Sequence, residues 1–94
     1  MKFKQITVTA NSTLKLTNTG GGYRAIVFAN SSTAAYRGVY YVSSTVAGVT
    51  GNTPVFAASG LTVTNASGGV TFTGAQNFNV TVLIQSGDMN LVVS

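Results

Sequence analysis

The chain of 94 residues has five Lys and Arg residues, one carboxylate side chain (Asp88), no His and no Cys. General acid–base catalysis uses His or paired carboxylates, and metal sites use clusters of His, Cys, Asp or Glu. The composition therefore predicts a protein that is not an enzyme and that uses no metal or other cofactor. A chain of this length forms a single domain, residues 1–94, and without Cys it has no disulfide.

In the first half of the chain, apolar and polar residues alternate, and β-branched and aromatic residues are frequent. This pattern predicts strands, because such side chains fit a pleated surface with one buried face. The predicted strands cover residues 2–9, 13–17, 23–29 and 36–43. The third of them is apolar at almost every position, which is typical of a central strand. The glycines within residues 19–22 predict a flexible hairpin turn between the second and third strands.

The second half has a less regular segment followed by two predicted hairpins. Residues 49–54 are predicted to form a loop with short pairing around 55–57, because Pro54 cannot donate a hydrogen bond within a central strand. The Gly-containing segments that follow favour tight turns between paired strands. The predicted hairpins join residues 61–65 to 70–73, and residues 78–85 to 89–93 across the loop 86–88.

Short strands at this spacing predict an all-β fold of about eight strands, either an antiparallel β-sandwich of the jelly-roll type or a small β-barrel. Charged residues make up 6% of the chain, against about 25% in ordinary soluble domains. Few charges also leave edge strands without the Lys and Glu residues that usually prevent edge pairing. The composition therefore predicts a homo-oligomer, in which part of this weakly hydrated surface is covered.

The chain contains no apolar stretch with the length of a signal-peptide core or of a membrane-spanning helix. Its longest apolar runs, such as residues 25–29, have the length of buried strands. We therefore expect no signal peptide and no insertion into a membrane.

Tyrosine and arginine residues are the strongest candidates for an interaction site. They gather on two neighbouring strands, and Arg beside Tyr on a β surface suits stacking on nucleotide bases, stacking on sugar rings or a protein interface. Packing of the Tyr rings at the edge of the core is the alternative. The tandem of Tyr40 and Tyr41 predicts one ring on each side of its strand. The candidate interface or ligand-binding residues are Tyr23, Arg24, Tyr36, Arg37, Tyr40 and Tyr41.

Strands rich in Thr, Ser, Asn and Gly recur along the chain, as in Gln5–Asn11 (QITVTAN) and Gly69–Gly74 (GVTFTG). In these strands, and in its start at Met1 without a signal peptide, the chain resembles the small β-rich virion proteins of tailed bacteriophages. These include decoration, head-fibre, collar and tail-fibre-tip proteins. The resemblance implies a β-sandwich or jelly-roll, often trimeric, that assembles in the host cytoplasm and works by binding.

Taken together, these features predict a non-enzymatic structural or attachment protein of a phage particle. It is expected to be made in the host cytoplasm, to reside in the virion and to act through homo-oligomeric β assembly, with a trimer as the expected form. Its expected partners are copies of itself and other virion proteins. A single-stranded nucleic-acid-binding β-barrel and a carbohydrate-binding module are the alternative functions.

Overall fold

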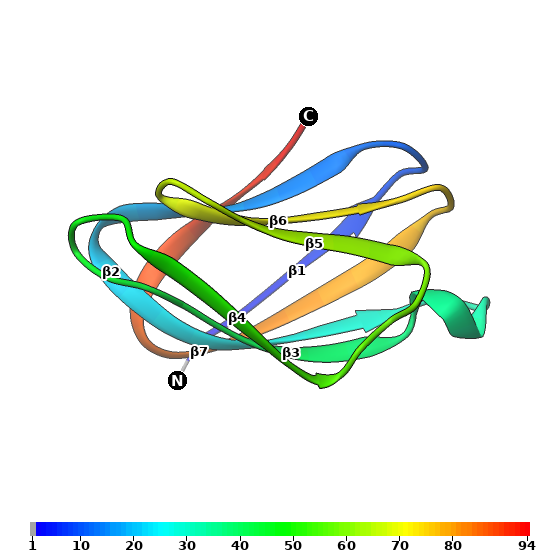
Figure 1. Ribbon diagram of the computed structural model, residues 1–94, viewed down its shortest axis with the longest axis horizontal. Helices are drawn as coiled ribbons and strands as arrows, with labels where there is room; N and C mark the ends of the chain where they lie inside the picture. Colours follow the sequence, from blue (N-terminus) through cyan, green and yellow to red (C-terminus); the bar gives the residue numbers. More distant parts are fainter. Residues whose placement is uncertain (1) are drawn as a thin grey trace.

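Seven antiparallel strands and one short 3-10 helix make up the computed structural model, which describes residues 2–94 (Figure 1). This range contains no α-helix, and it contains no helix of any kind that is long and apolar enough to cross a membrane. The elements are β1 (Lys2–Val8), β2 (Thr13–Asn30), η1 (Ala34–Tyr36), β3 (Gly38–Ser44), β4 (Thr50–Phe56), β5 (Leu61–Ala66), β6 (Gly69–Gly74) and β7 (Phe78–Val93).

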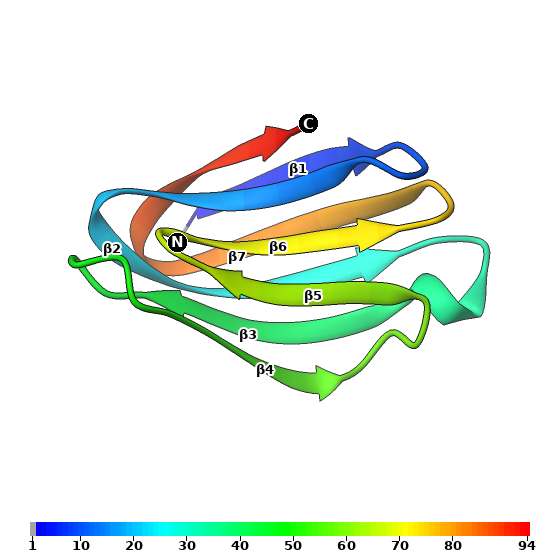
Figure 2. The same ribbon diagram turned by 45° about the horizontal axis from the view of Figure 1, so that its top comes forward.

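The strands form two layers that share β2 and β7, as Figure 1 and Figure 2 show. The five-strand layer has the order β1-β7-β2-β3-β4 and uses the second half of β2 and the first half of β7. In the four-strand layer, the first half of β2 pairs with β6 on one side and with the end of β7 on the other, and β5 pairs with β6. This arrangement confirms the predicted all-β sandwich.

Alternate residues of both layers fill the space between them. The five-strand layer contributes Val27, Val42 and Val82, all fully buried, while Phe72 and Met89 enter from the four-strand layer. This is the period of two that the alternating sequence predicts for strands with one buried face. The core therefore holds the layers together through side chains that both of them contribute.

The long strands β2 and β7 each bend where they pass from one layer to the other. Gly22 and Gly87 lie in these bends with φ of +75° and +71°, a conformation that Gly adopts without the steric cost of a Cβ. The sequence prediction of hairpins at residues 19–22 and 86–88 is therefore wrong. The strands flanking each glycine segment do not pair with each other, because both halves of β7 pair with β2.

Two further differences concern the middle of the chain. The predicted loop at residues 49–54 is wrong, because Thr50–Phe56 forms strand β4, which pairs with β3. Pro54 is tolerated there because β4 is an edge of its layer. Tyr36, predicted at the start of a strand, ends the 3-10 helix η1 instead. The two merged hairpins and the additional β4 account for seven strands where about eight are predicted.

Candidate functional site

The outer surface of the five-strand layer, which points away from β5 and β6 (Figure 1), carries two rows of apolar residues beside polar ones. One row of neighbouring residues crosses four strands in register, with Leu83 paired to both Phe3 and Ile26, and Ile26 paired to Tyr41. A second row runs from Phe28 through Val39 to Phe56. We call this surface the apolar face, and it consists of Phe3, Ile26, Phe28, Val39, Tyr41, Phe56 and Leu83.

Two phenylalanines at opposite edges of the apolar face are the most accessible of these side chains. Phe3 on β1 is 69% exposed and Phe56 on β4 is 63% exposed, with Phe28 at 40% between them. An antiparallel sheet that faces water on one side normally alternates apolar inner residues with polar outer residues. The apolar face departs from this pattern at seven positions, so it is the candidate interaction surface of the layer.

A shallow hollow of about 490 Å³ lies within the apolar face, beside Arg37. Phe28 and Phe56 line it together with the polar side chains of Asn79 and Thr81. The Arg37 guanidinium is held at its rim, because Nε donates to the Ser31 carbonyl at 2.8 Å and an Nη donates to the Ser32 carbonyl at 3.1 Å. The hollow offers an apolar pocket with a fixed cationic edge to an incoming side chain.

The remaining charges lie mostly elsewhere. Asp88, at the bend of β7, forms ion pairs with Lys2 at 3.4 Å and Lys4 at 3.1 Å, and its Oδ1 accepts a hydrogen bond from the Met89 N–H. That backbone hydrogen bond and then the one from Lys4 lower the pKa of the Asp88 carboxyl. These contacts connect β1 to the bend of β7, and no carboxylate side chain remains to neutralise Arg24 or Arg37.

The structure separates the predicted tyrosines into core and surface residues. Tyr23, Tyr36 and Tyr40 are 3%, 8% and 2% exposed, so they pack in the core and do not reach a partner. Tyr40 accepts a hydrogen bond from the Ala58 N–H at 2.8 Å. Tyr41 is 38% exposed, and its hydroxyl donates to the Gln85 side chain at 2.8 Å. The opposite orientations of the tandem pair are confirmed, and only Tyr41 belongs to the apolar face.

The two predicted arginines are both exposed but lie at opposite ends of the layer, so the structure does not bring the six candidates together. Sequence reasoning missed Phe3, Phe28 and Phe56. Their signal was present, because Phe3 lies on the opposite side of β1 from Ile6 and Val8. The almost continuous apolar run in the second half of β2 is a second signal, since it indicates a strand that is covered on both faces.

Tyr23 provides a prediction on stability at high pH. Its hydroxyl donates to the Leu16 carbonyl at 3.1 Å, and burial raises the pKa of Tyr23 to about 12. An unfolded Tyr ionises near pH ~10, so the contribution of this group to stability is complete below that pH. It is lost as pH rises towards the folded value, because the unfolded chain then binds fewer protons than the folded one.

Replacing Tyr23 with Phe is expected to remove this part of the alkaline loss. At neutral pH the variant loses one hydrogen bond and about 1 kcal/mol of unfolding free energy. Between about pH 10 and pH 12 the difference in unfolding free energy between the two proteins shrinks. The wild type loses stability there because Tyr23 ionises in the unfolded chain but not in the folded one, whereas Phe has no proton to lose. Urea unfolding of both proteins across this range measures the effect, and parallel curves at all pH values would contradict it.

Residues 2–94 contain no group of three or more His, Cys, Asp or Glu side chains that is arranged to hold a metal ion. Among known proteins, no family model, no characterised protein and no solved structure matches this chain significantly.

Proposed function

We propose that this chain is a non-enzymatic assembly protein that self-associates through the apolar face. The observation that carries the proposal is the exposure of Phe3 and Phe56, at 69% and 63%, at the two edges of a surface whose central residues are also apolar. The low charge content of the chain, 6%, supports it further, because few side chains are available to hydrate this surface.

The energies are of the right size for association. Burial of one Phe side chain stabilises a complex by about 1.5–3 kcal/mol, and association costs about 4–15 kcal/mol in lost freedom of motion and ordering. Each copy contributes Phe3, Phe28 and Phe56, so a dimer that covers this face on both copies buries six phenylalanines and a trimer buries up to nine. Because these rings are already partly buried, their further burial in a dimer offsets a cost in the lower part of this range, while Arg24 and Arg37 remain hydrated at the ends of the layer.

The setting of this assembly is a second part of the proposal. The resemblance of the Thr-rich and Asn-rich strands to virion proteins supports a structural or attachment role in a phage particle, as a trimer with other virion proteins as neighbours. The mass of the oligomer in solution, once measured, will distinguish a trimer from a dimer. The nucleic-acid alternative as predicted from Tyr and Arg is less well supported, because Tyr23, Tyr36 and Tyr40 are buried and the two arginines lie at opposite ends of the layer.

Light scattering coupled to size exclusion tests self-association. The wild type is expected at a small multiple of 9.6 kDa at micromolar concentration. The double variant Phe3→Ser, Phe56→Ser removes both exposed rings, and we expect its dissociation constant to rise by about a hundredfold or more, so that it elutes as a monomer.

The matched control is Val49→Ser, which removes an apolar side chain of similar exposure, 68%, outside the apolar face. It is expected to keep the wild-type mass, and far-UV circular dichroism checks that all variants remain folded. A wild type of 9.6 kDa at every concentration, or a double variant with unchanged mass, would contradict the proposal.

A further inference from the structure

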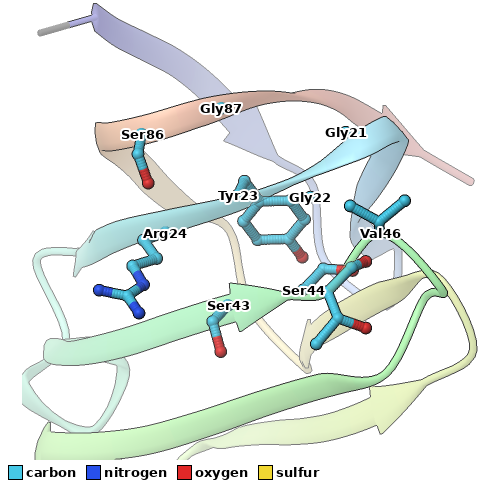
Figure 3. Close-up of a pocket in the computed structure, with 10 residues that line it drawn as sticks. Gly21, Gly22, Tyr23, Arg24, Ser43, Ser44, Val46, Ser86 and Gly87 are labelled. Atoms are coloured by element: carbon cyan, nitrogen blue, oxygen red, sulfur yellow. The ribbon is translucent and has the colours of Figure 1, made fainter.

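A second hollow lies at the end of the sandwich where β2 and β7 bend, beyond the rows of the apolar face (Figure 3). It measures about 560 Å³. Residues of three neighbouring strands and of the turn after β3 surround it, among them Gly21, Arg24, Ser43, Val46, Ser86 and Gly87. This hollow differs from the one beside Arg37 because hydroxyl groups, not phenylalanine rings, surround its cation.

Arg24 is the cation of this hollow, and its guanidinium makes no hydrogen bond or ion pair within the described chain. The other charged groups near strand ends are engaged, since Lys2 and Lys4 pair with Asp88, and Arg37 donates to two carbonyls. A guanidinium has five N–H donors in a planar fork that fits an oxyanion through two parallel hydrogen bonds. Arg24 is therefore free to bind an anion supplied from outside.

Two serine hydroxyls flank Arg24 at the same level of the sheet. Ser43 on β3 and Ser86 on β7 are the residues paired with Arg24 on its two neighbouring strands. In Figure 3 the side chains of Arg24 and Ser43 lie next to each other on adjacent strands. Neither serine hydroxyl has a hydrogen-bond partner among residues 2–94, so both are available to a ligand rich in hydroxyl groups.

Val46 and Gly21 also line the hollow. Val46 at the rim is 70% exposed and offers an apolar contact to the C–H groups of a sugar ring. Glycine keeps side chains out of the hollow, and a Cβ added at Gly21 would meet no atom within 4 Å. The hollow is thus open, cationic at one point, lined by hydroxyls and free of acidic side chains.

From this arrangement we infer that the hollow binds the anionic group of an acidic polysaccharide. The carboxylate or sulfate group accepts hydrogen bonds from Arg24, the sugar hydroxyls bond to Ser43 and Ser86, and the ring contacts Val46. A glycan fits better than a nucleic acid because no exposed aromatic ring lines the hollow to stack on a base. The site does not depend on self-association, since it lies outside the apolar face.

Isothermal titration calorimetry with four polymers tests the inference. Oligogalacturonate presents carboxylates, dextran sulfate presents sulfates, unmodified dextran is neutral, and a single-stranded oligodeoxynucleotide presents phosphates with bases. Binding is expected for one or both of the charged glycans and not for dextran. The charged glycan that binds more tightly identifies the anionic group that the site prefers.

Three variants locate the binding. Arg24→Gln is expected to weaken it about tenfold or more, in line with the loss of a charge-assisted contact. Lys15→Gln removes the same charge from the outer side of the four-strand layer and is expected to change affinity less than about twofold. Gly21→Phe adds a large ring to the lining of the hollow without altering charge, and we expect it to weaken binding as strongly as Arg24→Gln.

Three results would overturn the inference. The first is equal weakening by Lys15→Gln and Arg24→Gln, which would indicate attraction to net charge alone. The second is unchanged affinity in Gly21→Phe, with circular dichroism showing that the variant is folded. The third is binding to the oligonucleotide but to neither charged glycan, which would make the ligand a nucleic acid.

Discussion

Replacing Gly87 with Ala is expected to destabilise the protein by about 3–5 kcal/mol, which is a large fraction of the stability of a domain of this size. A Cβ added at Gly87 would lie 2.1 Å from the Gly22 carbonyl oxygen, and φ at Gly87 is +71°. The neighbouring atom belongs to the backbone of the other bent strand, so no side chain can move aside. Relief of the overlap requires the two bends to separate, and with them the strands that connect the layers.

Gly21→Ala is the matched control, because it lies in the bend of β2, has no positive φ and has open space around an added Cβ. Its unfolding free energy in urea is expected to stay within about 0.5 kcal/mol of the wild type. An Ala at Gly87 that costs less than about 1 kcal/mol would show that the bends do not depend on this close approach.

The same bends explain the main error in the fold predicted from the sequence. Gly and Asp in Ser86-Gly87-Asp88 favour a change of chain direction, and a hairpin is the commonest way to produce one. The local sequence does not state which strand the flanking segments will pair with. In this fold both halves of β7 pair with β2, from Val93 opposite Leu14 to Asn79 opposite Asn30. The glycines therefore permit a bend between layers instead of a turn within one.

Strand β4 is a second case in which the local sequence did not predict the structure. Its segment Thr50–Phe56 contains Gly51, Asn52 and Pro54, which all disfavour strands. The pairing of β4 with β3 overrides these preferences, because the ladder hydrogen bonds satisfy one side and the edge position leaves the other side free. In contrast, the alternating segments in β1, β3 and β5 were predicted correctly, since there the local preference and the tertiary position agree.

The candidate site was predictable only in part. The alternation of β3 correctly separated Tyr40, which is buried, from Tyr41, which is exposed. For Tyr23, the same reasoning did not show whether the ring fills the core or meets a partner. The burial of Tyr23 depends on how β2 bends back over its own first half, where the hydroxyl meets the Leu16 carbonyl. Phe3 and Phe56 were missed because the prediction of an interface rested on Tyr and Arg, whereas the most exposed rings of the apolar face are phenylalanines.

Phe72 lies at the contact between the two layers. Phe72 on β6 is fully buried, and its ring meets that of Tyr40 on β3 edge to face at 5.4 Å between centroids and 75° between planes. Phe72→Ala leaves a cavity at this junction and is expected to cost about 3–5 kcal/mol. The melting temperature should fall by more than about 12 °C, given the usual sensitivity of domains of this size.

Phe72→Leu separates the two contributions to that loss. Leu retains most of the volume but not the aromatic contact, so a cost of about 1–1.5 kcal/mol is expected for it. Unfolding in urea of the wild type and the two variants gives the comparison. A loss below about 1 kcal/mol in Phe72→Ala would mean that the layers can close over the cavity. In that case the contact between Phe72 and Tyr40 would not be what fixes their separation, and the bends at Gly22 and Gly87 would carry that role alone.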